Sequence, residues 1–551
     1  MEPISCKLGL GPSDPFKKMR RLRIGIVDLV AGVPSRSLYA RVLFPNFASI
    51  MPQAIAVWCE RAGHDVRFAC YTGSDDISCL LPGDLDMLFV CAFTHAAYMA
   101  YATSSLYRSK GAVTVLGGPH ARAFPNHARK YFDYVLGLTD EDLLGSILQD
   151  CQKHRPLGLQ LSAKKQPPNL PGVRDRWKYV KYLHSRTILP STAILGSLGC
   201  PYTCSFCVDA EIPYQTLEFD SMKEDLRFLQ RHMRRPRVVW HDPNFGVQFD
   251  RYLDLIEEAV PPGSIEFIAE SSLSLLSESR LPRLKRNGFK AVLPGIESWY
   301  ELGNKSGSGK SAGLRKMQDV TKRVQLILSQ IPYVQTNFVF GLDSDEGEEP
   351  FELTKQFIES VPGVFPACAL LTSYGQSAPL SRRLSQQGRV TPVPFPFLYS
   401  GFISNVKPLN YSWPAFYRAM ESLLQHAFSW RMVRRRAQAV RGSSVQTIHL
   451  IRALSAEGRG RVAQLAYFRQ RLETDIELRD FIEGASQKVP EWMTRKARED
   501  LGPMRCWLPE SPLSYDCADD APSEVLVPRI ASARLFPAND RRQEDSQSSP
   551  S

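Results

Sequence analysis

The chain has 551 residues, of which 43% are apolar and 23% are charged. This length is enough for two or three domains with substantial cores, and the composition excludes the disordered and fibrous classes. The formal net charge of +11 permits anionic partners but does not require nucleic acid.

The cysteines and the apolar segments indicate a protein located in the reducing interior of the cell. Twelve cysteines are scattered along the chain apart from one triplet, which does not resemble a disulfide framework. The first 27 residues carry charges but lack the apolar core and cleavage site of a secretory signal. The most apolar later run, 85–102, contains Asp86, Thr94 and His95 and is short for a membrane span. We expect a cytoplasmic protein in which this run is a buried strand leading into a helix.

Residues 22–150 follow an N-terminal extension, 1–21, and alternate strand and helix patterns. This alternation predicts an α/β domain with a doubly wound, Rossmann-like parallel sheet, and such sheets bind ligands beyond the carboxyl ends of their strands. The turn Leu116-Gly-Gly-Pro-His-Ala121 lies at such an end, where two glycines allow close backbone approach to a ligand. A tight strand-to-helix turn without a ligand explains the same residues. The expected strands are 23–30, 65–70, 85–91, 112–116 and 133–136.

A second series of strands begins after residues 151–190, which contain five prolines and no sustained period and are expected to be a linker. From Thr192 the alternation runs for six cycles, which predicts parallel strands joined by right-handed crossovers. Ser221 and Glu224 have the spacing of a helix capping box. The expected strands are 192–198, 238–240, 265–269, 291–293, 334–340 and 367–371.

The cysteine triplet Cys200-Pro-Tyr-Thr-Cys204-Ser-Phe-Cys207 directly follows the first strand of this second series. Thiolates are ligands for iron–sulfur clusters or zinc. A cubane cluster normally takes four cysteines, so three leave one metal position open to a substrate or cofactor. A zinc site with a distant fourth ligand, or reduced thiols without a metal, are the alternatives at this point.

The spacing Cys-x-x-x-Cys-x-x-Cys, with a proline after the first cysteine and an aromatic residue before the last, resembles the signature of radical S-adenosylmethionine (radical SAM) enzymes. The resemblance implies a partial (β/α)6 barrel at 191–395 and a [4Fe-4S] cluster held by the three cysteines. S-adenosylmethionine would occupy the fourth position and be cleaved to a 5′-deoxyadenosyl radical. Its implied contacts are Phe206, Glu270, Gly295, Glu297, Ser298 and Gly341.

The domain that precedes the barrel resembles the cobalamin-binding domain of one large radical SAM class. In that class the turn formed here by Gly117, Gly118, Pro119 and His120 faces the nucleotide tail of the cofactor. None of the ten histidines stands in an Asp-x-His-x-x-Gly arrangement. The resemblance therefore leaves two options: cobalamin without a lower protein ligand, or a vestigial domain without cobalamin.

Two further motifs depart from the family pattern. The Gly-Gly-Glu often found after strand two of the barrel is replaced by His241-Asp242-Pro243. The Gly-x-Ile-x-Gly-x-x-Glu pattern of strand five retains only its second glycine, Gly341. The assignment of S-adenosylmethionine contacts is therefore weaker than that of the cluster ligands.

Beyond the barrel, residues 396–517 have longer helical patterns, and residues 518–551 have the polar composition of a disordered tail. The basic stretch Arg431-Met-Val-Arg-Arg-Arg-Ala-Gln-Ala-Val-Arg is explained either by a solvated or barrel-packing face or by contact with an anionic substrate or membrane surface.

The leading hypothesis is a radical SAM enzyme that methylates an unactivated carbon with the help of cobalamin. The alternative is radical SAM oxidation, cyclisation or rearrangement without cobalamin, and a second alternative is a non-catalytic zinc or iron–sulfur interaction protein. The resemblance implies a small-molecule, lipid or tetrapyrrole-like substrate and an electron donor such as flavodoxin or ferredoxin. Neither nucleic acid nor a transmembrane segment is expected, and the residues that act on the substrate are not assigned.

Overall fold

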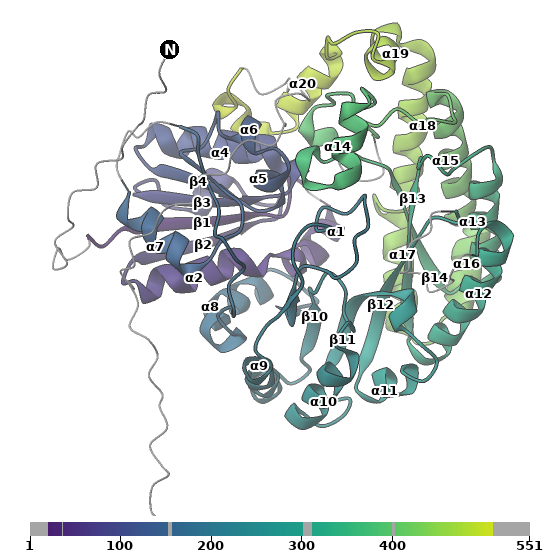
Figure 1. Cartoon of the computed structure of the whole chain (residues 1–551), viewed down its shortest axis with the longest axis horizontal. Coiled ribbons are helices and arrows are strands. Elements are labelled where there is room, and N and C mark those ends of the chain that lie inside the picture. Colours follow the sequence, from purple (N-terminus) through teal and green to yellow (C-terminus); the bar gives the residue numbers. More distant parts are fainter. Residues whose placement is uncertain (1–19, 36, 152–156, 301–310, 399–402, 511–551) are drawn as a thin grey trace, which may run out of the picture.

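The computed structural model describes residues 20–35, 37–151, 157–300, 311–398 and 403–510. Two parallel six-stranded sheets, each accompanied by helices, lie next to each other, and the C-terminal helices wrap around the second one (Figure 1). This arrangement confirms the predicted fold class.

The first sheet has the strand order β2-β1-β3-β4-β5-β6, and its strands are parallel. Successive side chains on a strand point to opposite faces, and helices cover both faces of this sheet. Met87 and Phe89 of β3 belong to the core shared with α2, whereas Leu88 and Val90 belong to the core shared with α4. The elements are β1 (Arg23–Leu29), α2 (Ile50–Arg61), β2 (Asp65–Tyr71), β3 (Met87–Ala92), α4 (Ala97–Ser109), β4 (Val113–Gly117), α5 (Pro119–Ala123), α6 (Pro125–Ala128), β5 (Tyr134–Leu136) and α7 (Glu141–Gln149).

The segment 151–190, predicted to be a linker, contains regular elements that its proline-rich composition does not indicate. It contains β6 (Leu159–Leu161), which pairs with β5 as the edge strand of the first sheet, and α8 (Val173–His184). Three residues are too few to show a period. Residues 159–161 form a strand because they pair with β5, and this pairing leaves no periodic pattern in the sequence.

The second sheet has the order β14-β13-β12-β11-β10-β7, so each strand lies beside the next one along the chain. All of its pairs are parallel. Sequential parallel strands bring all of their carboxyl ends to one edge, where barrels of this type hold their active sites. The elements are β7 (Thr192–Ile194), α9 (Phe219–His232), β10 (Arg237–Trp240), α10 (Phe249–Ala259), β11 (Glu266–Ser272), α11 (Leu281–Arg286), β12 (Phe289–Glu297), α12 (Gly313–Gln330), β13 (Tyr333–Phe340), α13 (Glu349–Ser360), β14 (Val364–Leu370) and α14 (Pro379–Gln386).

Two local expectations for the barrel need correction. The first strand is split into β7 and β8 (Ser197–Leu198), and β8 pairs antiparallel with β9 (Gln215–Thr216). Helix α9 begins at Phe219 with Glu218 as its N-cap, so Ser221 lies inside the helix and forms no capping box. Ser221 and Glu224 have the spacing of a capping box, but the helix begins two residues before Ser221.

The C-terminal region is helical, as expected, and it contacts both sheets. The 3-10 turn η6 (Phe395–Phe397) places Phe395 against Tyr98 and Tyr101 of α4. The final turn η7 (Gly502–Trp507) also packs on α4. The helices are α15 (Trp413–Ala427), α16 (Trp430–Ala439), α17 (Ser443–Leu454), α18 (Arg459–Thr474), α19 (Ile476–Glu483) and α20 (Glu491–Glu499).

Within the described ranges, no single helix has both the length and the apolar character to cross a membrane. One bent pair, 39–47 with 50–61, meets the criteria of length and composition alone. The domain limits proposed from the sequence, 22–150, 191–395 and 396–517, stay a prediction.

Candidate active site

The three cysteines lie in one loop between β8 and β9, at the carboxyl end of the first barrel strand. Cys200 is buried, and Cys204 and Cys207 are half-buried. The loop opens at Gly199, whose φ is +66°. A side-chain carbon at Gly199 would lie 2.4 Å from the carbonyl oxygen of Pro213, so the two ends of the loop meet there and glycine is required.

The backbone of the loop forms a turn at Cys204–Cys207 and donates one hydrogen bond to a cysteine sulfur. The N–H of Cys207 donates to the carbonyl of Cys204 over 2.9 Å, and the N–H of Asp209 donates to Sγ of Cys207 over 3.5 Å. Such donors stabilise a thiolate and tune a cluster. No three His, Cys, Asp or Glu side chains converge as ligands of one ion in the described part of the chain. A cubane needs a wider arrangement, because each of its thiolates binds a different iron.

The first barrel strand is held in place by Asp242, which stands where the family often has Gly-Gly-Glu. This buried carboxylate accepts hydrogen bonds from the N–H of Gly196 at 2.7 Å, from Oγ of Ser197 at 2.7 Å and from the hydroxyl of Tyr252 at 2.9 Å. Burial raises the pKa of Asp242 to about 6, although these hydrogen bonds act in the opposite direction. Asp242 therefore fixes the strand end from which the cysteine loop departs.

The predicted S-adenosylmethionine contacts lie in the cysteine loop and at the carboxyl ends of β11, β12 and β13. Phe206 packs with an apolar group that includes Leu342 and Leu380, so the cysteine loop meets the end of β13. Gly341, with φ of +92°, begins the turn after β13. Glu270 is exposed near the end of β11, and its carbonyl accepts the N–H of Phe245.

Glu297 has an unusual backbone conformation at the end of β12. It is the one non-glycine residue with positive φ, +67°, among the residues that the structure describes. Its carboxylate folds back over Gly295, where a side-chain carbon would lie 2.1 Å from Oε1 of Glu297. Left-handed conformations of non-glycine residues cost free energy and cluster at functional sites. The structure thus brings Gly295 and Glu297 together at the mouth of the barrel.

Ser298 belongs to a buried polar cluster that the sequence did not reveal. Its Oγ lies 3.4 Å from Oδ1 of Asp345, whose Oδ2 accepts the N–H groups of Gly341 at 2.9 Å and of Leu342 at 3.2 Å. Nζ of Lys316 donates to the carbonyl of Ser298 over 2.5 Å. Asp345 belongs to the polar run that follows Gly341 in the sequence, whereas Lys316 gave no signal because it lies within an ordinary amphipathic helix.

The turn predicted to face cobalamin divides into an open part and a buried part. A side-chain carbon at Gly117 would meet no atom within 4 Å, whereas one at Gly118 (φ +91°) would lie 3.0 Å from Sγ of Cys91. Pro119 begins α5, and His120 is fully buried with Nε2 2.7 Å from the hydroxyl of Tyr101. Open space beside Gly117 fits the close backbone approach of a ligand. The side chain of His120 instead forms part of the core.

Two ion pairs clamp the cysteine loop between the two sheets. Nη2 of Arg122, on α5, lies 3.0 Å from Oδ1 of Asp209, and Arg382, on α14, pairs with Glu211. At Gly375, after β14, a side-chain carbon would lie 2.1 Å from the carbonyl oxygen of Ala123, so the segment after the last barrel strand packs directly on α5. The turn of the first sheet and the cysteine loop are therefore neighbours.

We predict that Arg122→Ala makes the cysteine loop open more often without unfolding the protein. Since the pair is partly exposed, its contribution to global stability should be below about 1 kcal/mol. A loss of about 1 kcal/mol in local stability corresponds to roughly fivefold more frequent opening of the loop. The measurement is the rate at which a chelator removes iron from the reconstituted protein. Arg237→Ala, which breaks the Arg237–Glu266 pair at the opposite end of the barrel strands, is the matched control and should leave this rate unchanged.

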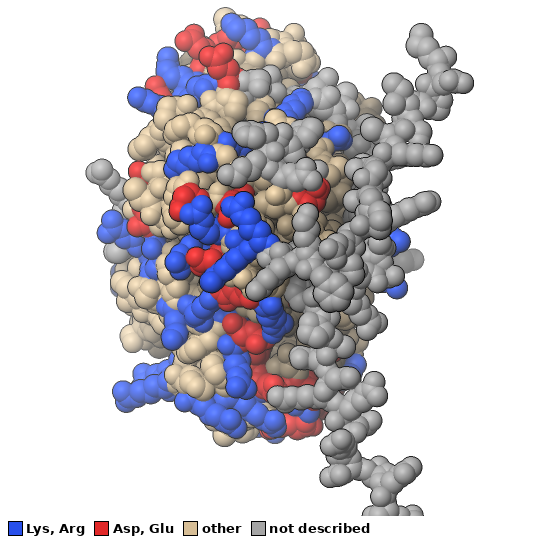
Figure 2. Space-filling model, turned by 90° about the vertical axis from the view of Figure 1, so that its left-hand side faces the viewer, with Lys and Arg blue, Asp and Glu red and all other residues tan. Residues whose placement is uncertain are grey.

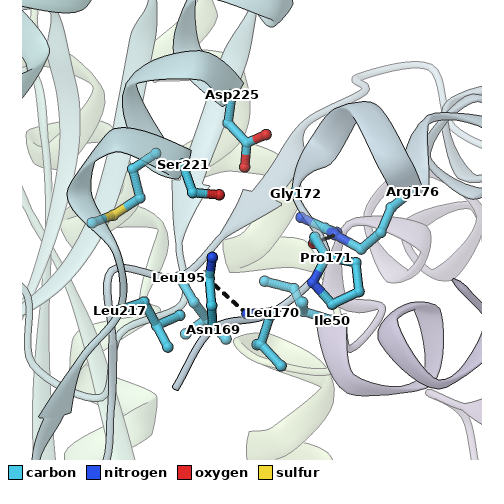
Figure 3. Close-up of a pocket in the computed structure, with 11 residues that line it drawn as sticks. Ile50, Asn169, Leu170, Pro171, Gly172, Arg176, Leu195, Leu217, Ser221 and Asp225 are labelled. Carbon is cyan, nitrogen blue, oxygen red and sulfur yellow. Dashed lines mark hydrogen bonds between the residues drawn. The ribbon is translucent and has the colours of Figure 1, made fainter. Parts of the chain in front are cut away.

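A small cavity at the junction of the two sheets is lined by none of the predicted site residues (Figure 3). Its wall includes Arg176 of α8 and Asp225 of α9, both buried. Arg176 donates from Nε to the carbonyl of Pro171 at 2.9 Å, from Nη1 to Oε1 of Gln53 at 3.0 Å and from Nη2 to the carbonyl of Ala193 at 3.3 Å. Because Gln53 is on α2 and Ala193 is on β7, this guanidinium joins the two sheets.

A six-unit parallel sheet with a three-cysteine loop after its first strand, preceded by a doubly wound domain, resembles the arrangement of radical SAM enzymes. No protein-family model matches the chain. Two curated relatives from Chlorobaculum tepidum are bacteriochlorophyllide d C-8(2)-methyltransferase, 25% identical over 313 residues, and bacteriochlorophyllide d C-12(1)-methyltransferase, 22% identical over 295 residues. The alignments cover 53% and 52% of this chain, and 67% and 64% of the relatives.

Among solved structures, the radical S-adenosylmethionine methyltransferase TsrM from Kitasatospora setae, with cobalamin and a [4Fe-4S] cluster bound, is similar at 15% identity and a TM-score of 0.48. The similarity covers 82% of this chain and 99% of that one. In its cysteine motif and in the order of its two sheets, the chain resembles the radical SAM enzymes that carry a cobalamin-binding-type domain before the barrel.

Proposed function

We propose that the chain is a radical SAM methyltransferase that uses cobalamin to methylate an unactivated carbon of a small molecule. The observation that carries the proposal is the Arg122–Asp209 contact of 3.0 Å, which joins the Gly117–Gly118 turn to the cysteine loop. A carbon-methylating enzyme of this type needs a methyl carrier close to the place where its substrate is activated. The methyltransferase activities of the two relatives from Chlorobaculum tepidum support the same reaction class.

Each predicted site residue has a proposed role. Cys200, Cys204 and Cys207 hold the cluster, and the backbone beside Phe206 borders the adenine of S-adenosylmethionine. The amino-acid and ribose groups are contacted by the strand ends, at Glu270, Gly295, Glu297, Ser298 and Gly341. When bound, the reduced cluster supplies the electron that cleaves S-adenosylmethionine, and cobalamin supplies the methyl carrier. Gly117, Gly118 and Pro119 offer backbone to cobalamin, and His120 supports the turn from the core.

The relatives act on bacteriochlorophyllide d, which is a tetrapyrrole. For this chain we propose a small-molecule substrate at the barrel mouth and an external one-electron donor of the flavodoxin or ferredoxin kind. Asp345 and Lys316 stabilise the mouth: Asp345 accepts two backbone N–H groups of the turn after β13, and Lys316 donates to the carbonyl of Ser298. These contacts keep the strand ends in one geometry.

The experiment is reconstitution without oxygen, with iron, sulfide and hydroxocobalamin, followed by corrin and iron analysis. We expect a bound corrin and a cluster in the same protein, and transfer of deuterium label from methyl-labelled S-adenosylmethionine to cobalamin. Gly117→Leu places a side chain into the open space beside the turn and should remove the corrin while iron is retained.

The other outcomes separate the alternatives. A cluster without corrin would favour radical oxidation, cyclisation or rearrangement. Zinc in place of iron, with no 5′-deoxyadenosine formed under reduction, would overturn both enzyme hypotheses.

A further inference from the structure

The neighbouring helices α16 and α17 carry a surface that is both apolar and basic, which we call the α16–α17 face. Its apolar members are Ile448, Leu450, Ile451 and Leu454, which are 37%, 44%, 44% and 49% exposed. Its basic members are the exposed arginines Arg431, Arg434 and Arg441. Exposed apolar residues scattered singly need no explanation, but four on one short helix form a patch.

The buried side of α17 is anchored, so its apolar side is held outward. The ring of His449 lies 4.7 Å from that of Tyr333 at an interplanar angle of 31°, and Nη1 of Arg452 donates to Oε1 of Gln335 over 2.6 Å. At the other end of the helix, Nε2 of Gln446 donates to the carbonyl of Ala437 on α16 over 2.9 Å. The apolar residues recur at three- and four-residue intervals on the side opposite His449, and rotation of the helix to bury them would break these contacts.

The charge of the two helices has one sign. Between Glu421 and Glu457 the sequence has six arginines and no aspartate or glutamate. The acidic group facing the exposed arginines is Glu359 of α13, whose Oε1 lies 3.5 Å from Nη2 of Arg431. By contrast, acidic and basic side chains are interspersed on the face of the molecule drawn in Figure 2.

We propose that the α16–α17 face binds the surface of a membrane that contains anionic lipids. Apolar side chains flanked by arginines, with no aspartate or glutamate on either helix, are the composition of interfacial helices. Trp430, which is 59% exposed at the start of α16, is of the residue type enriched at membrane interfaces. A second copy of the chain is a poorer occupant, because two such faces would bring like charges together. This inference does not depend on the proposed reaction.

The test is co-sedimentation of the full chain with vesicles of phosphatidylcholine alone or mixed with phosphatidylglycerol. We expect binding to the anionic vesicles that salt reduces, and weak or no binding to the neutral ones. The triple variant Ile448→Ser, Ile451→Ser, Leu454→Ser and the triple variant Arg431→Gln, Arg434→Gln, Arg441→Gln should each bind at least about tenfold more weakly.

Two control variants change the same residue types elsewhere on the surface. Ile188→Ser, Leu409→Ser, Ile476→Ser alters residues that are 74%, 61% and 64% exposed, and Arg231→Gln, Arg234→Gln, Arg235→Gln alters exposed arginines near the end of α9. Both should bind as the unaltered protein does. Equal binding by all four variants, equal binding to both vesicle types, or no vesicle binding together with a dimer in solution would each overturn the proposal.

Discussion

Cys204→Ala is expected to remove the iron–sulfur cluster and to abolish reductive cleavage of S-adenosylmethionine. The loop between β8 and β9 supplies three thiols, and the remaining position belongs to S-adenosylmethionine in the proposed reaction, so no ligand replaces a lost thiolate. Iron should fall from about four atoms per chain to near zero, with no 5′-deoxyadenosine formed under a strong reductant. Iron and sulfide analysis and chromatography of the reaction products measure both effects.

The exposed residue Cys506 provides the matched control, because Cys506→Ala removes a thiol outside the loop and should keep the cluster. Circular dichroism of Cys204→Ala should show an intact secondary structure, since the first sheet does not depend on the cysteine loop for its strand pairing. Cleavage of S-adenosylmethionine by the Cys204→Ala protein would refute the assigned ligand role.

Arg176→Met is expected to cost about 3 kcal/mol of stability, the largest effect we predict for a residue outside the site. Arg176 is 2% exposed and donates hydrogen bonds to Gln53 of α2, a helix that covers the first sheet, and to Ala193 of β7 in the second sheet. Burial raises the pKa of the Asp225 carboxyl to about 6, and the charge of Arg176 acts in the opposite direction. Methionine keeps the apolar length of the side chain but leaves the acceptors unpaired. Thermal unfolding followed by circular dichroism and tryptophan fluorescence measures the loss.

Arg174→Met is the control on the same helix, because Arg174 is exposed and its replacement should change stability by less than about 0.5 kcal/mol. A melting temperature of Arg176→Met equal to that of Arg174→Met would contradict the role of Arg176 at the junction. Asp225→Asn separates the charge from the hydrogen bond, since asparagine can still accept the N–H of Val173.

Local patterns in the sequence predicted most of the strands, and they are also the basis of the proposed cluster ligands. The runs at 23–30, 65–70 and 85–91 became β1, β2 and β3 with small shifts at their ends. Buried parallel strands are continuous apolar runs. Each such strand can therefore be recognised from its own residues, without knowledge of its neighbours. The three cysteines are separated by only a few residues, so they share a loop in whatever fold the chain adopts.

Contacts between distant segments were not predictable in the same way. Strand β6 exists because β5 is its neighbour, and His120 is buried because Phe395 of the C-terminal region packs on it with a centroid distance of 4.9 Å. Lys316 reaches Ser298 from the first turn of α12. None of these residues has an unusual local sequence, because the reason for its position lies in another part of the chain.

The sequence by itself determined which three thiols share one loop and where strand and helix alternate, since both depend on residues close together in the chain. The tertiary structure decided that the Gly117–Gly118 turn lies beside the cysteine loop, through Arg122 and Asp209. It also decided that Glu297 and Ser298 meet Gly295 and Asp345 at the barrel mouth. The physical reason is that sheet order and domain packing set these distances, and neither is encoded in the spacing of any one motif.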